Sequence, residues 1–280
     1  MTTVDKALSL LDHFSNEQTE IGLSAFARLA GYDKSAVLRM LSALGRAGFV
    51  EQDPQSRKYR LGGAFLRFAR LREATFPLID LLRPFAMRLN EATSETVHIS
   101  HFAGSRLSTI LVIDSPRTTR VHVNRGMTLP LNATASGLCW LAFSAPDVRE
   151  DHLSATQAQY QEGTLTDRAL IEAHLEGFQA TGYSLAERSF DSDVTSVAVP
   201  IFGMRGEVLA CLSVAAVASR MTPEIIERSS QLAVQIAVEA TFALGATPPS
   251  TYPGATSRST CSGATRAPDL LRRDPAPQLP

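Results

Sequence analysis

Residues 34–46 carry a hydrophobic pattern with the period of an α-helix. Apolar side chains recur every three or four positions, so they share one face that packs against a core, namely Val37, Met40, Leu41 and Leu44. Short hydroxyls and guanidinium groups share the opposite face, namely Ser35, Arg39, Ser42 and Arg46. Arginine suits the major groove of DNA, where it pairs with guanine edges or phosphates. The pattern indicates a DNA-reading helix; the alternative is an ordinary solvated face.

A shorter helical pattern precedes this segment, and a hairpin pattern follows it. Residues 24–30 form the first helix, and residues 49–61 form two short strands around a turn at Asp53-Pro54. Helix, turn, helix and hairpin in this order predict a winged helix-turn-helix. Two basic residues near the hairpin tip are expected beside a phosphate strand or in a minor groove, namely Arg57 and Lys58.

The hydrophobic period changes near residue 94 from that of helices to that of strands. Residues 62–90 are helical with a break around 75–77. Strands are then expected at 96–102, 107–113, 120–123, 126–131, 182–186, 194–202 and 208–216, with helices beginning near 135 and 166 and over 224–244. This order predicts an α+β fold, with a mainly antiparallel sheet flanked by helices.

Composition divides the chain in the same way. Residues 1–72 hold 11 Lys and Arg against 7 Asp and Glu, whereas residues 73–245 hold 12 against 19. A basic module joined to an acidic one fits a DNA reader with a second, separate task. We predict a DNA-binding domain over 1–62, a linker helix over 63–80 and a second domain over 81–245. Residues 246–280 hold 7 of the 15 prolines and are predicted to be disordered.

Several classes of protein are disfavoured by the sequence. No apolar run reaches the roughly 18 residues that span a bilayer, and the amino-terminal pattern is not that of a signal peptide, so a cytoplasmic location without membrane contact is expected. The three cysteines are far apart, which indicates reduced thiols rather than a disulfide framework, namely Cys139, Cys211 and Cys261.

Enzymatic and metal-binding motifs are sparse. His98 and His101 lie three apart in an expected strand, so they point to opposite faces and do not suit one metal ion. Ser136 has no histidine nearby in sequence to activate it, although a triad assembled by the fold stays open. We expect neither catalysis nor a cofactor. An enzyme, a metal sensor and a thiol sensor using Cys139 or Cys211 remain the alternatives.

A binding cavity fits the second domain better. Ala135, Ser136 and Gly137 begin a helix whose first N–H groups carry positive potential and suit a carboxylate or other small anion. Ser196 and Ser213 lie on expected neighbouring strands and could offer hydroxyls to the same cavity. The alternative is that these small residues only permit close packing of helix and sheet.

The chain resembles the IclR family of bacterial transcription regulators over about residues 4–245. The stretches that carry the resemblance are VDKALSLLDHF, KSAVLRMLSALGRAGFVEQ, KYRLGGAFLRFARL, GMTLPLNATASGLCWLAF and VTSVAVPIFGMRGEVLACLSVAA. The resemblance implies a winged helix-turn-helix followed by a GAF-like effector-binding domain. It also implies a homodimer or homotetramer on double-stranded operator DNA, commonly as a repressor of a catabolic operon.

The resemblance also implies particular site residues. The DNA contacts would come from Lys34, Ser35 and Arg39, with Arg57 and Lys58 in the wing. The helix pattern itself places Ser42 and Arg46 near the DNA backbone or exposed. The effector would be a small organic acid or an aromatic metabolite. Its pocket would use Pro130, Leu131, Ala135, Ser136, Gly137, Ser196 and Ser213, with Glu187 or Asp191 as an acidic residue.

Overall fold

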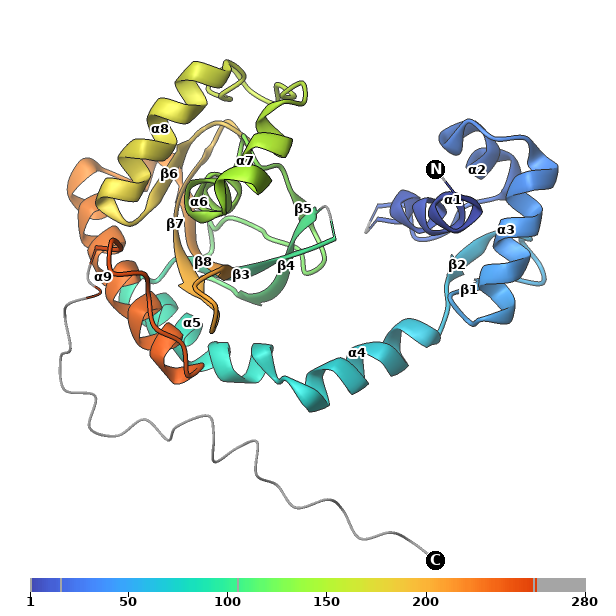
Figure 1. Cartoon of the computed structure of the whole chain (residues 1–280), viewed down its shortest axis with the longest axis horizontal. Helices are drawn as coiled ribbons and strands as arrows, with labels where there is room; N and C mark the ends of the chain where they lie inside the picture. The colour runs from blue at the N-terminus through green and yellow to red at the C-terminus, as the bar shows by residue number, and fades with distance from the viewer. Residues whose placement is uncertain (1, 16, 105, 254, 256–280) are drawn as a thin grey trace, which may run out of the picture. The chain divides into compact units, whose positions relative to one another are not determined.

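The computed structural model describes residues 2–15, 17–104, 106–253 and 255. The chain divides after Leu78 into two compact units, which are described separately (Figure 1). The first contains helices α1 (Thr3–Ser9), η1 (Leu10–His13), α2 (Leu23–Ala30), α3 (Lys34–Arg46) and α4 (Ala64–Thr75), and strands β1 (Val50–Gln52) and β2 (Tyr59–Leu61).

The first unit is a helix-turn-helix closed by a two-stranded wing. Gly31 adopts a φ of 69° after α2, a left-handed conformation that glycine accepts without a steric penalty. Asp33 then caps α3 by accepting a hydrogen bond from the Ala36 amide. The apolar stripe of α3 is buried as expected, in a core formed by Leu10, Ile21, Phe26, Val37, Met40, Leu41, Leu44, Val50 and Tyr59.

The second unit is built on a six-stranded antiparallel sheet of order β5-β4-β3-β8-β7-β6. Its strands are β3 (Thr96–Ala103), β4 (Arg106–Ile113), β5 (Thr128–Leu129), β6 (Ser184–Glu187), β7 (Val194–Phe202) and β8 (Val208–Val217). Its helices are α5 (Leu78–Thr93), α6 (Ala135–Phe143), α7 (Pro146–Leu153), α8 (Arg168–Thr181), η2 (Ala218–Arg220) and α9 (Pro223–Ala243). The α+β class and the antiparallel sheet are therefore confirmed.

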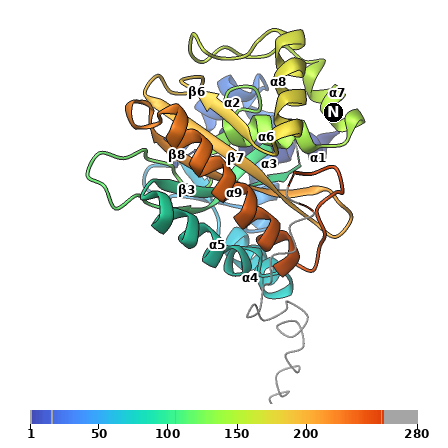
Figure 2. The same cartoon turned by 90° about the vertical axis from the view of Figure 1, so that its left-hand side faces the viewer.

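Helices cover both faces of this sheet. Alternate residues of β7 point to opposite faces, so Ala198 joins the cluster under α6 while Val197 packs with Ile226 of α9. Figure 2 shows α5 and α9 together over the second of these faces. Helix α6 is buried from Ala135 to Ala142, because the sheet and α8 enclose it. Its first turn consequently opens toward the interior of the unit.

Two expectations about this unit are wrong. Residues 120–123 form no strand, because the Val121 carbonyl is bonded by the Thr96 side chain rather than by a neighbouring strand. The strand expected over 126–131 shortens to Thr128–Leu129. Residues 246–280 are predicted to be disordered, and most of them lie outside the described residues. The described beginning of this segment is folded, since Tyr252 is only 4% exposed and donates a 2.9 Å hydrogen bond to the Gly182 carbonyl.

Candidate functional site

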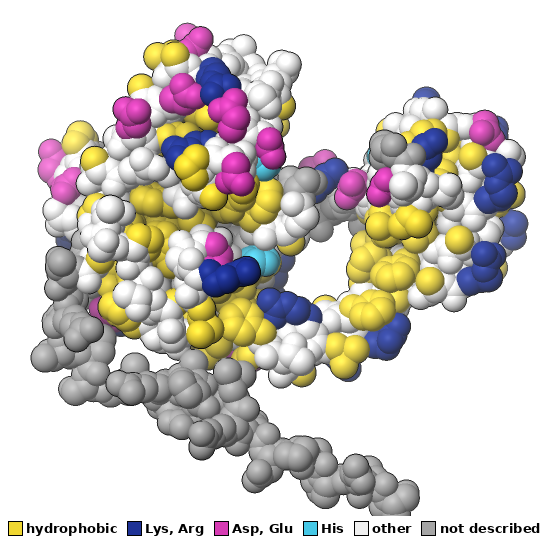
Figure 3. Space-filling model, in the orientation of Figure 1, with side chains coloured by type: hydrophobic (Ala, Val, Ile, Leu, Met, Phe, Trp, Pro, Cys, Tyr) yellow, Lys and Arg dark blue, Asp and Glu magenta, His cyan; other side chains and the backbone are white. Residues whose placement is uncertain are grey.

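The polar face of α3 is exposed along its length. All five residues predicted for DNA contact on this helix lie on the surface, namely Lys34, Ser35, Arg39, Ser42 and Arg46. Figure 3 shows lysine and arginine side chains gathered along the edge of the first unit where α3 lies. A positive, exposed face on a helix with a buried opposite side is the geometry by which helices of this kind enter a major groove.

The amino-terminal end of this face is organised by a chain of hydrogen bonds. Ser35 Oγ donates to Asp33 Oδ1 at 2.6 Å and accepts from Arg39 Nη1 at 3.4 Å. The hydrogen bonds from Ser35 and from the Ala36 amide hold the pKa of Asp33 below its ordinary value, so this carboxylate stays charged. Arg39 is thus directed along the helix toward its amino terminus.

The wing presents a second basic element. Arg60 pairs with Glu51 across the two strands at 3.2 Å, so its charge is balanced. Arg57 and Lys58 are exposed at the turn, and Arg57 has a φ of 58°. The Gln52 side chain donates to the Arg57 carbonyl at 2.8 Å, which supports this turn conformation. The structure therefore keeps both predicted wing residues on the surface.

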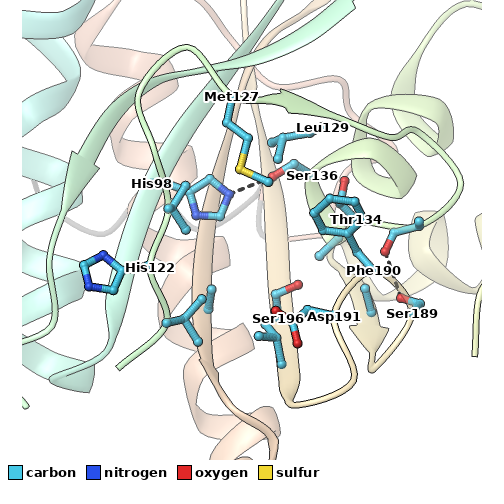
Figure 4. A pocket seen from close by; sticks show the side chains of 17 residues that line it. His98, His122, Met127, Leu129, Thr134, Ser136, Ser189, Phe190, Asp191 and Ser196 are labelled. Carbon is cyan, nitrogen blue, oxygen red and sulfur yellow. Dashed lines mark hydrogen bonds between the residues drawn. The ribbon is translucent and has the colours of Figure 1, made fainter. Parts of the chain in front are cut away.

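A cavity of about 100 Å³ lies at the first turn of α6 (Figure 4). Apolar side chains form most of its wall, and a few polar groups converge on it. The lining residues are His98, Val121, His122, Val123, Met127, Leu129, Ala133, Thr134, Ala135, Ser136, Ala186, Ser189, Phe190, Asp191, Val194, Ser196 and Ala215. A mainly apolar cavity with a few placed polar groups is typical of small-molecule sites.

Four of the nine residues predicted for this pocket line the cavity, namely Ala135, Ser136, Asp191 and Ser196. The other five stand outside the lining, namely Pro130, Leu131, Gly137, Glu187 and Ser213. Glu187 is exposed at the end of β6, and Ser213 lies one layer behind Ser136. A Cβ atom on Gly137 would come within 2.4 Å of the Pro130 carbonyl oxygen, so close packing accounts for this glycine.

His98 joins the site although sequence reasoning assigned it no role there. It lies on β3 opposite Ser213 of β8, and its Nε2 lies 3.2 Å from Ser136 Oγ, which in turn lies 2.7 Å from Ser213 Oγ. Burial lowers the pKa of His98 from 6.5 to about 4, so the ring is neutral near pH 7. His98 meets Ser136 because β3 pairs with β8 and α6 packs on the same sheet, and one sequence reveals neither arrangement.

The segment between β4 and β5 also contributes to the wall, through Val121, His122 and Val123. Two buried polar residues, Glu95 and Thr96, fix the start of this segment. Thr96 Oγ1 donates to the Val121 carbonyl at 2.8 Å, and Arg117 pairs at 3.3 Å with Glu95, which also binds Arg220 at 2.7 Å. The strand predicted for residues 120–123 gave no indication that they lie over the cavity.

The first turn of α6 offers hydrogen-bond donors to the cavity wall. Thr134 Oγ1 accepts from the Gly137 amide at 3.0 Å and donates to the Pro130 carbonyl at 2.8 Å. In the part of the chain that the structure describes, no acceptor is assigned to the amides of Ala135 and Ser136. The first amides of a helix, together with its dipole, favour an anionic ligand.

Two observations bear on the alternative metal and thiol chemistries. Among the described residues, no group of three or more His, Cys, Asp and Glu side chains is placed to hold a metal ion. Cys139 and Cys211 are buried, and burial raises the pKa of the Cys139 thiol, which disfavours the reactive thiolate. The described residues also contain no helix that is long and apolar enough to cross a membrane.

Two family models match the chain. The model for the IclR helix-turn-helix domain covers residues 3–54, and that for the bacterial transcriptional regulator IclR C-terminal domain covers residues 74–240. Among curated proteins, the HTH-type transcriptional regulator XynR of Escherichia coli is 27% identical, over 78% of this chain and 87% of its own length. The HTH-type transcriptional regulator TsaQ1/TsaQ2 of Comamonas testosteroni is 30% identical, over 71% of this chain and 72% of its own.

Solved structures give the same result. A crystal structure from Silicibacter sp. TM1040 that carries the IclR designation matches with a TM-score of 0.85 and 38% identity, over 90% of this chain and all of that one. An IclR homologue from Microbacterium hydrocarbonoxydans, crystallised in complex with 4-hydroxybenzoate, matches with a TM-score of 0.71 and 22% identity. That match covers 87% of this chain and 99% of the homologue. At this identity the second match shows the fold alone.

Proposed function

The chain belongs to the IclR family of transcriptional regulators, and from this premise we propose that it represses a catabolic operon until a small acid binds its second unit. Family membership makes it a DNA-binding regulator with an effector-binding domain rather than an enzyme. The finer proposal concerns the effector, the assembly and the direction of control. We place this activity in the cytoplasm, where the operator DNA is found.

The observation that carries the effector proposal is the cavity at the first turn of α6. The amides of Ala135 and Ser136 provide a place for a carboxylate, and Met127, Leu129 and Phe190 provide an apolar wall for the rest of the ligand. An apolar cavity of roughly 150 Å³ is known to admit benzene, so about 100 Å³ suits a short organic acid or, with small adjustments, one aromatic ring. The homologue crystallised with 4-hydroxybenzoate supports an aromatic acid as one option.

DNA recognition is proposed for the exposed faces of α3 and the wing. Lys34, Ser35 and Arg39 would enter the major groove, with Ser42 and Arg46 nearer the phosphates. Arg57 and Lys58 would contact the backbone or the minor groove beside it. A titration of the intergenic DNA upstream of the gene, followed by fluorescence anisotropy, tests this assignment: a specific complex at moderate salt is expected, and its absence would refute the proposal.

A homodimer formed through α4 is proposed for the assembly. Leu66 and Leu71 of this helix are 71% and 57% exposed, and Phe65 and Phe68 are also exposed. A helix with this much apolar surface is typical of a contact between proteins. Replacing Leu66 with Glu should shift the mass in analytical ultracentrifugation toward the monomer, whereas replacing the neighbouring exposed Arg67 with Glu should change it less.

The effector would act by preferring one arrangement of the two DNA-binding units over another. The operator fixes the distance between two recognition helices, so a change of arrangement alters affinity without touching the α3 surface. Benzoate and 4-hydroxybenzoate are suitable first probes, added to the anisotropy titration. We expect at least one to weaken operator binding in the wild type and not in Ser196→Leu, which fills the cavity. Equal effects in both proteins would refute this cavity as the effector site.

A further inference from the structure

His98 is a buried polar group of the cavity to which the family comparison assigns no role. Its side chain is 6% exposed, lines the cavity, and lies on β3 at the centre of the sheet. Its Nε2 contacts Ser136 Oγ, but its Nδ1 is buried without a hydrogen-bond partner among the described residues. Buried polar atoms are nearly always paired, so an unpaired nitrogen in a cavity wall requires an explanation.

The proton on this ring can be placed by following the hydrogen bonds. Ser213 Oγ has Ser136 Oγ as its assigned partner, and Ser136 Oγ has Ser213 Oγ and His98 Nε2. If Ser213 donates to Ser136 and Ser136 donates to Nε2, both hydroxyl hydrogens have an acceptor. In the reverse direction, the Ser213 hydroxyl hydrogen has no acceptor among the described residues. The first arrangement therefore prevails, and because the neutral ring carries one N–H, that hydrogen lies on Nδ1.

The same pair could be mistaken for a nucleophile and its base. Ser136 Oγ lies 3.2 Å from His98 Nε2 at the start of a helix, as in a serine hydrolase. Two features oppose this. In a catalytic triad a third group accepts the Nδ1 hydrogen and orients the ring, and the described residues supply none. A ring whose pKa is lowered to about 4 is also a weak base near pH 7.

We propose that His98 is a specificity-determining residue of the cavity, and that its Nδ1–H selects effectors that present a hydrogen-bond acceptor, namely a carboxylate or carbonyl oxygen. Figure 4 shows the free side of the ring facing the segment that carries His122. Nδ1 is covered in the structure, so an acceptor reaches it only if the part of that segment around His122 and Val123 moves aside; among the described residues neither is assigned a hydrogen bond. This inference rests on the proposed effector cavity and adds the class of ligand that the cavity accepts.

The first test needs no ligand. Proton–nitrogen correlation spectra of the protein labelled with ¹⁵N-histidine distinguish the two neutral tautomers, and the spectrum of His98→Gln identifies the signal of His98. We expect the Nδ1–H tautomer near pH 7. The Nε2–H tautomer or a charged ring would overturn the inference.

The second test uses two variants and two probes. Asparagine places its amide near the position of Nδ1, whereas glutamine places it near Nε2, so the pair separates the two roles of the ring. Benzoate and benzamidine have the same shape, but benzoate offers acceptors and benzamidine only donors. By calorimetry, benzoate should bind the wild type at least tenfold more tightly than benzamidine. His98→Gln should lose at least tenfold in benzoate affinity, and His98→Asn no more than about threefold.

The outcomes separate this inference from the proposed function. The role of His98 would be overturned if His98→Gln bound benzoate within twofold of the wild type and kept its melting temperature. It would also be overturned if the wild type bound neither benzoate nor benzamidine. If benzoate binds through His98 but leaves operator affinity unchanged, recognition stands and the regulatory proposal fails. Hydrolysis of p-nitrophenyl acetate that Ser136→Ala abolishes would instead show a nucleophile and overturn the inference.

Discussion

The DNA-facing surface of the first unit and the cavity of the second unit hold their polar groups in opposite ways. On α3 the side chains predicted to contact DNA point outward, and hydrogen bonds run along the surface from Arg39 to Ser35 to Asp33. In the cavity the chain from His98 through Ser136 to Ser213 is buried. Water replaces a lost partner more readily in the first case than in the second. Substitutions should therefore alter DNA affinity in the first unit, and both stability and recognition in the second.

The largest effect is expected at Gly137, where the helix start meets the chain before it. A Cβ atom there would lie 2.4 Å from the Pro130 carbonyl oxygen and 2.5 Å from Leu131 Cα, and both are backbone atoms that cannot rotate away. Gly137→Ala should lower the free energy of unfolding by about 3 kcal/mol, measured by urea denaturation. Gly177→Ala in α8 is the control, because open space surrounds that position, and it should raise stability by up to about 1 kcal/mol. Equal stability of the two variants would show that Gly137 is not a packing position.

The second effect is a pH dependence that arises from His98. In the unfolded chain the ring takes a proton near its ordinary pKa of 6.5, whereas in the folded unit it does so only near 4. Between these values the unfolded state binds more protons, so stability is complete above pH 6.5 and falls as the pH drops. At pH 5 the loss should be about 2 kcal/mol.

Urea denaturation of the wild type and of His98→Gln near pH 7.5 and near pH 5 measures this contribution. Glutamine does not titrate, so the variant should lose about 2 kcal/mol less than the wild type over this range. Asp191 and His122 also line the cavity and are unchanged in the variant, so the difference between the two pH profiles reports His98. Parallel pH profiles would mean that the folded ring is protonated as readily as the unfolded one.

The exposed surface provides the contrasting case. Arg39→Ala should weaken specific operator binding by about 1–3 kcal/mol if the guanidinium reads a base, with urea denaturation unchanged because the side chain lies on the surface. Arg46→Ala should cost less and act equally on specific and non-specific DNA, since this residue is expected nearer the phosphates. An unchanged affinity in Arg39→Ala would remove this residue from the recognition surface.

The difference between the exposed helix face and the buried cavity also explains which features could be predicted from the sequence. The period of α3 placed Val37 inside and Arg39 outside, because a single helix fixes both directions without reference to the rest of the fold. The cavity depends on which strand lies beside which, and the pairing of His98 with Ser213 joins segments more than 100 residues apart. The irregular segment at 120–123 has a strand-like composition, so only tertiary packing distinguishes it from a strand.

The smallest effect compares two serines that each make two side-chain hydrogen bonds, one in each unit. Ser136 is buried, and Ser136→Ala leaves His98 Nε2 and Ser213 Oγ without the partner that the structure assigns them, so unfolding free energy should fall by about 1 kcal/mol or slightly more. Ser35 is exposed, and water can take its place beside Asp33 and Arg39, so Ser35→Ala should change stability by less than about 0.5 kcal/mol. Urea denaturation measures both values. A larger loss in Ser35→Ala than in Ser136→Ala would contradict the view that burial, rather than the number of hydrogen bonds, sets the cost.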